Sequence, residues 1–218
     1  PNEVIERLLK FGGFPEPFLA NSERDSARWR ASHLDVILRQ DLLDLERVRE
    51  IKSIEILISL LAARVGSTVS YQSLAEDICV SIHTIKHWLE ILERLFVIFK
   101  VPPYAKNIAG SLKKESKYFF YDTGVLTGDA SARLENTLAC ALLAELQMHQ
   151  DTEGKKVGLF FLRNKQKQEV DFLTVVDQNP TAMIEVKLSE NNFSPELFRF
   201  KSRLKPSLVR AYQVVFHL

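Results

Sequence analysis

The chain has 218 residues, of which 46% are hydrophobic and 26% are charged, a balance typical of a globular protein with a sizeable core. Lysine and arginine total 29 against 28 acidic residues, so the formal net charge is +1. This near-neutral charge excludes a bulk electrostatic attraction to nucleic acid or to an anionic membrane, and any such contact has to come from a local patch.

Cysteine usage and hydropathy exclude further classes of protein. Cys79 and Cys140 follow no metal-binding or disulfide spacing, and we expect buried thiols. No apolar run reaches the roughly 18 residues of a membrane span, and no signal-peptide pattern opens the chain. We therefore expect no membrane partner and a cytoplasmic location. The chain begins at Pro1 in what reads as the middle of a helix, which favours a piece of a longer protein.

Residues 1–50 are expected to form a helical lid or linker. Residues 1–11 read as a helix, and the two glycines and two prolines of Phe11-Gly-Gly-Phe-Pro-Glu-Pro-Phe18 should break it. Ser22–Glu50 then resumes as one long charged helix or a pair of helices. Its charged residues are typical of a solvated helix face.

Residues 51–125 carry the pattern of a winged helix-turn-helix domain. An amphipathic helix comes first, Ser70 can cap the next, and a short turn leads to a third helix and two strands around a wing. The expected ranges are helices Ile51–Arg64, Tyr71–Ile78 and Ile82–Leu95, the turn Cys79–Ser81, strands Phe96–Val101 and Lys117–Tyr121, and the wing Pro102–Glu115.

A DNA-binding winged helix would place its last helix in the major groove and its wing on phosphates. The residues predicted to contact nucleic acid are His83, Thr84 and Lys86 on that helix and Lys106, Lys113 and Lys114 in the wing. Because phosphate neutralisation supplies most of the affinity, a helix with one lysine makes a poor groove reader. A packing or protein-docking module is therefore the alternative. His83 and His87 lie one turn apart, but no third ligand accompanies them, so we expect surface histidines.

The remaining residues, 126–218, are expected to form a mixed α and β domain. The pattern predicts helix Ala132–His149, strands Val157–Leu162, Gln168–Val176 and Ala182–Leu188, helix Pro195–Leu204 and strand Arg210–Phe216. Arg163, Lys165 and Lys167 lie between the first two strands and are candidates for a basic, nucleic-acid-binding surface.

Strand alternation groups the charged residues of this domain. Glu169, Asp171 and Leu173 should share one face of their strand, and Glu185 and Lys187 should share a face about 7 Å apart, two residues at roughly 3.3 Å each. Hydrolysis of a phosphodiester uses carboxylates that hold Mg²⁺ or Mn²⁺ and a lysine that steadies the attacking water or the phosphate. The candidate catalytic residues are Asp171, Glu185 and Lys187, and the candidate metal ligands are Asp171, Glu185, Glu135 and Glu169.

Each of these assignments has a structural alternative. Glu185 and Lys187, like Asp171, could belong to an ordinary charge lattice on an exposed sheet face. Glu135 lies near the start of its helix, where the helix dipole favours a solvated glutamate. If Asp171 and Glu185 share one cation with Lys187 at the rim, the nuclease interpretation gains; if Lys187 pairs directly with Asp171, it loses.

The order of elements and charged residues resembles the PD-(D/E)XK nuclease core. In that superfamily the aspartate opens the second strand, the glutamate-x-lysine lies on the third, and a glutamate often comes from the first helix. The resemblance covers about the last 90 residues. It implies an αβββαβ domain with Asp171, Glu185, Lys187 and Glu135 at its site.

Further strings along nearly the whole chain extend this resemblance. They are Gly12-Gly-Phe-Pro-Glu16, Leu92-Glu-Arg-Leu95, Tyr118-Phe-Phe-Tyr-Asp-Thr-Gly-Val-Leu126, Leu134-Glu135, Glu169-Val-Asp-Phe172 and Ile184-Glu-Val-Lys187. Together they are similar to prokaryotic AAA-type ATPases whose C-terminal half is a domain of unknown function. The resemblance implies an N-terminal P-loop module in the full-length protein. No G-x-x-x-x-G-K-[ST] occurs here, so this chain should not hydrolyse ATP, and ATP would act only through that module.

The expected fold is therefore α/β (α+β), with a lid or linker at 1–50, a winged helix at 51–125 and a restriction-endonuclease-like domain at 126–218. Two functions remain open. In the first, the chain is the DNA-handling end of an ATPase and cleaves phosphodiesters with Mg²⁺ or Mn²⁺. In the second, its nuclease-like fold is a non-catalytic binding or assembly module that regulates the ATPase or forms a homo-oligomer.

Overall fold

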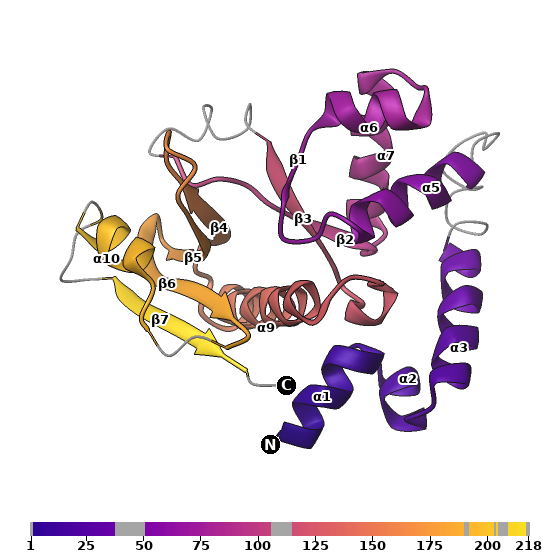
Figure 1. The fold of residues 1–218 in the computed structure, drawn as a ribbon, viewed down its shortest axis with the longest axis horizontal. Coiled ribbons are helices and arrows are strands. Elements are labelled where there is room, and N and C mark those ends of the chain that lie inside the picture. Colours follow the sequence, from indigo (N-terminus) through magenta and orange to yellow (C-terminus); the bar gives the residue numbers. More distant parts are fainter. Residues whose placement is uncertain are drawn as a thin grey trace. The chain divides into compact units, whose positions relative to one another are not determined.

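The structure, a computed structural model, describes residues 2–37, 51–105, 115–189, 192–202, 204 and 209–216. Helices and two β-sheets make up an α/β fold, as the sequence predicts. The chain divides into two compact units (Figure 1). The first comprises Pro1–Lys100 and Tyr118–Asp129, and the second comprises Val101–Lys117 and Ala130–Leu218.

Three helices open the first unit: α1 (Asn2–Phe11), α2 (Pro15–Ala20) and α3 (Glu23–Val36). The helix break at Gly12 and Gly13 is present, but Pro15–Ala20 is helical. Pro15 occupies the first turn, where its missing N–H has no intrahelical partner to lose. Ser22 caps α3 by accepting the N–H of Asp25 at 3.3 Å. Residues 38–50 of the predicted charged helix lie outside the described residues.

A buried ion pair fixes the chain beside Gly12. Arg30 Nε lies 3.3 Å from Asp122 Oδ2, and Asp122 Oδ1 accepts the N–H of Gly124 at 2.9 Å. Gly12 has φ +78°, and a Cβ there would lie 1.9 Å from Asp122 Oδ1. Arg30 also donates to the carbonyl of Phe11 at 3.3 Å. Glycine is therefore required at position 12 both for its backbone conformation and for space.

The helix-turn-helix elements follow closely the predicted ranges. They are α5 (Ile51–Ala62), α6 (Tyr71–Ile78) and α7 (Ile82–Arg94). Ser70 caps α6 by accepting the N–H of Ser73 at 3.4 Å, as predicted, and Ser81 caps α7 by accepting that of Thr84 at 3.0 Å. These side chains satisfy backbone donors that the helix itself cannot.

The expectation of buried thiols is wrong for Cys79. This residue ends α6 in the left-handed conformation, with φ 60°, and its side chain is exposed at the turn. Cys140, in a later helix, is half-buried, and both cysteines are free.

The chain also forms a small three-stranded sheet. Its strands are β1 (Thr68–Val69), β2 (Ile98–Val101) and β3 (Ser116–Phe120), in the order β1-β3-β2, and the short helix η2 (Thr123–Val125) follows. β2 and β3 correspond to the two predicted wing strands: β2 starts two residues later and ends at the predicted Val101, and β3 is shifted by one residue at each end. β1 was not predicted, because two residues are too few to show strand alternation. Every residue of β3 is buried.

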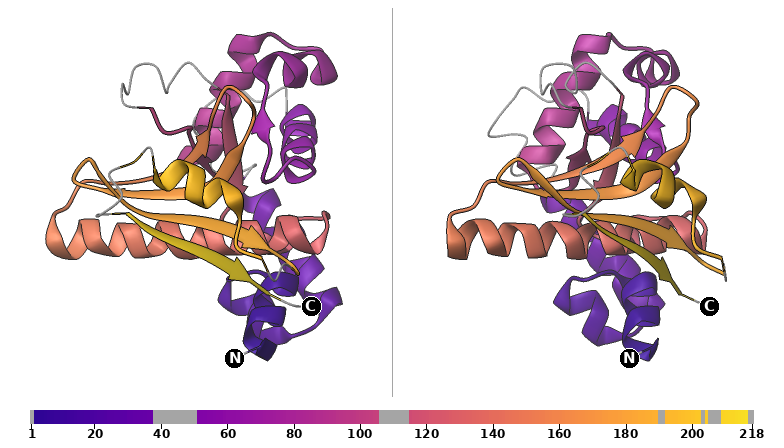
Figure 2. Two further views of the ribbon diagram at one scale, coloured as in Figure 1. Left: turned by 60° about the vertical axis from the view of Figure 1, so that its left-hand side comes forward. Right: turned by 90° about the vertical axis from the view of Figure 1, so that its left-hand side faces the viewer.

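The second unit contains a four-stranded sheet between two helices. Its elements are α9 (Ala130–Glu153), β4 (Val157–Arg163), β5 (Glu169–Val176), β6 (Asn179–Lys187), α10 (Pro195–Lys201) and β7 (Arg210–Val215). The strand order is β4-β5-β6-β7, antiparallel except for the parallel pair β6 and β7. Both views of Figure 2 place α9 along one face of this sheet and α10 on the other. The predicted order of helices and strands is present.

A bulge in β5 changes the predicted alternation. Phe160 of β4 pairs with Leu173 and Leu162 pairs with Val170, so two steps along β4 face three along β5. The extra residue lies at Asp171–Phe172. As a result Leu173 joins Val170 in the apolar core beneath α10, and the prediction that it shares the face of Asp171 is wrong. Bulges of this kind redirect a side chain within a strand.

Within the described ranges, no helix combines the length and the apolar character needed to cross a membrane.

Candidate functional site

A buried lysine lies at the centre of the predicted carboxylates. Lys117, at the start of β3 and 1% exposed, extends its ammonium among three acidic side chains. Its Nζ lies 2.7 Å from Glu169 Oε1, 3.1 Å from Glu135 Oε1 and 3.7 Å from Asp171 Oδ1. Sequence reasoning missed this residue. The signal was a lone charge at the start of the otherwise apolar strand Lys117-Tyr-Phe-Phe-Tyr121, which a buried strand tolerates only with a partner.

The charges of this cluster nearly balance. Burial disfavours the ammonium of Lys117, but Glu135, Asp171 and Glu169 outweigh burial and hold its pKa above the ordinary value. Burial raises the pKa of Glu135 from 4.5 to about 7, against the opposing effect of Lys117. Arg163 Nε adds a second cation 3.6 Å from Glu169 Oε2. Two cations therefore face three carboxylates, one of which holds a proton readily near neutral pH.

Glu185 and Lys187 form a separate pair on β6. Glu185 is 6% exposed, and its Oε1 lies 3.2 Å from Lys187 Nζ. Burial and the charge of Asp171 raise the pKa of Glu185 to about 7, while Lys187 opposes the shift. The second oxygen of Glu185, Oε2, is buried and has no hydrogen-bond partner in the described part of the chain. A buried oxygen in this state carries a cost in stability.

Asp171 connects the two groups. Its Oδ2 accepts the N–H of Val186, next to Glu185, at 2.8 Å, and its Oδ1 faces Lys117. The bulge in β5 accounts for this position, because it turns the Asp171 side chain toward the backbone of β6. The lysine close to Asp171 is therefore Lys117, whereas the structure pairs Lys187 with Glu185.

The four predicted metal ligands come from two sides of the sheet. Glu185 is in register with Gln213 of β7, and Gln213 accepts the N–H of Ser194 at the start of α10. Residues in register point to the same face, so Glu185 lies on the α10 side, whereas Glu135 comes from α9. Among the described residues, no group of three or more His, Cys, Asp or Glu side chains is arranged to hold a metal ion. Glu135 and Glu185 thus lie on opposite sides of the sheet.

The predicted nucleic-acid contacts on α7 are only partly available. His83 and Lys86 are exposed, and Lys86 Nζ lies 5.7 Å from the centre of the Tyr71 ring. The hydroxyl of Thr84 is 2.8 Å from that of Ser81 and belongs to the helix cap. Of the predicted wing contacts, Lys106, Lys113 and Lys114 lie outside the described residues.

The turn between β4 and β5 exposes the other predicted basic residues. Arg163, Lys165 and Lys167 are all exposed, but Arg163 also faces Glu169. Asn164 and Gln168 close the turn, since the Gln168 N–H donates to the Asn164 side chain at 3.0 Å and the Asn164 side chain donates back at 2.7 Å. The turn is therefore a compact structure that presents Lys165 and Lys167 to solvent.

The curated relatives that the chain matches are uncharacterized proteins, and they are longer than this chain. One from Mycobacterium tuberculosis is 30% identical over 125 residues, which cover 57% of this chain and 28% of that protein. One from Haemophilus influenzae is 27% identical over 218 residues, which cover 95% of this chain and 52% of that protein. One from Methanocaldococcus jannaschii is 23% identical over 211 residues, covering 93% and 46%. The chain thus spans about half the length of the last two relatives. No solved structure gives a significant match.

Two family models cover almost all of the chain. Residues 134–217, which hold most of α9 and the four-stranded sheet, match the domain of unknown function DUF4143. Residues 2–136 match another domain of unknown function, DUF8612. Because this second match spans more than half of the sequence, the chain belongs to the DUF8612 family.

Proposed function

We propose that the chain is a non-catalytic binding and assembly module of a longer ATPase, and that its C-terminal unit resembles a nuclease without cutting phosphodiester bonds. The observation that carries this proposal is the ammonium of Lys117, within 3.7 Å of Glu135, Glu169 and Asp171. In a metal-dependent nuclease a divalent cation takes the centre of such a carboxylate group. Here a cation would have to displace a buried lysine whose pKa those same carboxylates raise.

The ATPase part of the proposal rests on the resemblance of the sequence strings and on length. Relatives from Haemophilus influenzae and Methanocaldococcus jannaschii are about twice as long as the segment that they share with this chain. That length leaves room for a separate nucleotide-binding module. The chain itself has no P-loop sequence, so binding and hydrolysis of ATP are proposed only for the longer protein.

Charge favours a protein partner over DNA for this module. The net charge is +1, and the exposed positions predicted to enter the groove on α7 carry one lysine and one histidine. Affinity for duplex DNA rises with the number of phosphates that lysine and arginine neutralise. The proposal therefore assigns the main contacts to the ATPase module or to further copies of the protein.

A specific observation favours a second candidate, a nuclease dependent on Mg²⁺ or Mn²⁺. The buried Oε2 of Glu185 has no hydrogen-bond partner in the described part of the chain, and Asp171 is close enough to raise the Glu185 pKa. With Lys187 beside them, these are the three residues that the sequence predicts as catalytic. A cation held by Asp171 and Glu185 alone would leave Glu135 and Glu169 with Lys117.

One experiment separates the two candidates. The 218-residue chain and its Asp171→Asn variant are incubated with supercoiled, duplex and single-stranded DNA in Mn²⁺ or Mg²⁺, with a chelator control. Binding of Mn²⁺ is followed in parallel by electron paramagnetic resonance. We expect no metal-dependent cleavage and no Mn²⁺ site with a Kd below about 1 mM. Cleavage that the chelator and Asp171→Asn both abolish would overturn the non-catalytic proposal and establish the nuclease.

The assembly role is tested in the full-length protein. Sedimentation velocity with and without residues 134–217 reports whether this segment holds copies of the protein together. We expect fewer subunits per particle after deletion. The same number of subunits per particle before and after deletion, together with an unchanged ATPase rate, would contradict the assembly role.

A further inference from the structure

A cavity of about 550 Å³ lies between α9 and the sheet of the second unit, away from the Lys117 cluster. One wall is a helical stripe, Leu142, Glu145, Leu146 and His149, spaced as one face of α9. On the other wall most residues are two apart along their strands and so point to the same side, whereas Thr181 and Ala182 are adjacent where the pairing of β5 with β6 shifts. This wall consists of Thr174, Val176, Thr181, Ala182, Ile184, Arg210 and Tyr212.

The strand register explains why this wall is continuous. Thr174 pairs with Ala182, Ala182 pairs with Arg210, and Ile184 pairs with Tyr212. The hydroxyls of Thr174 and Thr181 lie 2.7 Å apart, and Thr174 also accepts the N–H of Ala182 at 3.1 Å. The polar groups in the middle of the wall thus form hydrogen bonds with one another. A ligand would meet apolar surface there and polar groups at the edges.

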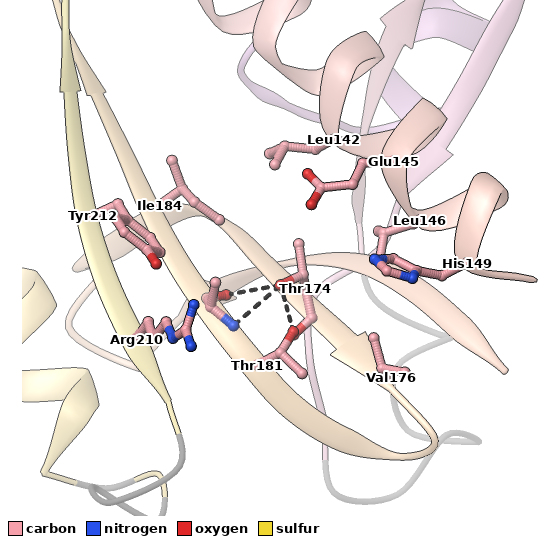
Figure 3. Close-up of a pocket in the computed structure, with 11 residues that line it drawn as sticks. Leu142, Glu145, Leu146, His149, Thr174, Val176, Thr181, Ile184, Arg210 and Tyr212 are labelled. Carbon is pink, nitrogen blue, oxygen red and sulfur yellow. Dashed lines mark hydrogen bonds between the residues drawn. The ribbon is translucent and has the colours of Figure 1, made fainter. Parts of the chain in front are cut away.

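Opposite charges flank the cavity from its two sides. Figure 3 shows Arg210 and Tyr212 on the β7 side and Glu145 and His149 on the α9 side, with the two threonines between them. Within the described part of the chain, neither the guanidinium of Arg210 nor the carboxylate of Glu145 has a hydrogen-bond or ion-pair partner. His149 differs, because its Nδ1 lies 2.7 Å from Glu153 Oε1. Among the described residues, the cavity therefore presents the cation of Arg210 opposite the anion of Glu145, neither of them paired with another side chain.

We propose that this cavity binds a zwitterionic molecule of dipeptide size. Its carboxylate would face Arg210, its ammonium would face Glu145, and its apolar body would cover Leu142, Leu146 and Ile184. The volume lies within the 300–1,000 Å³ usual for small-molecule sites, and such sites combine apolar walls with a few polar groups. This site is independent of the proposed assembly role, because it shares no residue with the Lys117 cluster.

The test uses leucyl-leucine as the probe and the 218-residue chain observed by NMR. Two blocked probes serve as matched ligands: N-acetyl-leucyl-leucine lacks the ammonium, and leucyl-leucine amide lacks the carboxylate. We expect the unblocked dipeptide to bind with a Kd of about 1 mM or tighter. Each blocked probe should bind about fivefold more weakly, as expected for the loss of one charged hydrogen bond.

Variants assign each charge to its partner. Arg210→Gln should weaken leucyl-leucine binding about fivefold and should no longer distinguish the free carboxylate from the amide. Glu145→Gln should likewise no longer distinguish the free ammonium from its acetylated form. Asp151→Asn, an exposed acid on α9 outside the cavity, is the matched control and should bind as the unmodified chain does. No shift changes at about 10 mM dipeptide, or equal binding by Arg210→Gln, would overturn the proposal.

Discussion

At the scale of single residues, we expect removal of the Lys117 side chain to cause the largest loss in the free energy of unfolding. Lys117→Met leaves Glu135, Glu169 and Asp171 without their shared cation, and breaking a buried ion pair typically costs about 3 kcal/mol in the free energy of unfolding. Urea denaturation measures this loss. It should be smaller at pH 5 than at pH 8, because protonation of Glu135 relieves the repulsion.

The matched control is Lys155→Met, which removes a lysine whose side chain is 40% exposed and paired with Glu153. Its free energy of unfolding should change little, since exposed ion pairs contribute little. Equal losses for the two variants would show that the Lys117 cluster is not a buried ion-pair network.

Glu135 should make stability depend on pH. Its pKa is about 7 in the folded chain and near 4.5 when unfolded, so the folded state binds this proton more tightly. The contribution of Glu135 to the free energy of unfolding is therefore full below pH 4.5 and is lost as pH rises to about 7. From pH 5 to pH 8, the free energy of unfolding of Glu135→Gln should therefore rise by about 1–3 kcal/mol relative to that of the unmodified chain.

Urea denaturation at a series of pH values measures this difference. Glu145→Gln on the same helix is the matched control, because Glu145 is exposed. If the difference in the free energy of unfolding between Glu135→Gln and the unmodified chain stayed constant with pH, Glu135 would not be a buried carboxyl with a raised pKa.

At the scale of elements, the turn after α1 offers a paired test. Gly12→Ala would force a side chain into a left-handed conformation and against Asp122, whereas a Cβ at Gly13 meets nothing within 4 Å. We expect Gly12→Ala to lower the free energy of unfolding by about 1–3 kcal/mol, and Gly13→Ala to change it by less than about 1 kcal/mol. Thermal unfolding compares them. Similar melting temperatures would contradict the packing of Asp122 against Gly12.

Elements set by local sequence were predictable, and those set by distant partners were not. The range of α6 was predicted because Ser70 caps its first turn and a turn follows at Cys79. The bulge at Asp171–Phe172 depends on the register between β4 and β5, which the alternation of β5 alone does not encode.

The same distinction applies to the candidate site. Strand alternation placed Glu185 and Lys187 on one side, and their ion pair agrees with that placement. Lys117 reaches Glu135, Asp171 and Glu169 across 18 to 54 positions of sequence, a contact that no local pattern specifies.

At the scale of the whole molecule, charge sets an upper limit on DNA binding. With a net charge of +1, we expect a fluorescent 20-base-pair duplex to bind only non-specifically, with a Kd weaker than about 1 μM at physiological salt. Fluorescence anisotropy at several salt concentrations measures this affinity. Lys165→Gln and Lys167→Gln should each lower the salt slope by about 1 if the β4–β5 turn makes the contact. Nanomolar, sequence-dependent binding would contradict a mainly protein-binding module.

The burial of Lys117 also makes it a chemical reporter. Amine-acylating reagents attack the neutral, accessible form of a lysine, and Lys117 is 1% exposed with its pKa held above the ordinary value. Its acylation therefore requires the second unit to open locally. The rate of labelling at Lys117, compared with that at the exposed Lys165 by mass spectrometry, would give the free energy of that opening in the intact chain.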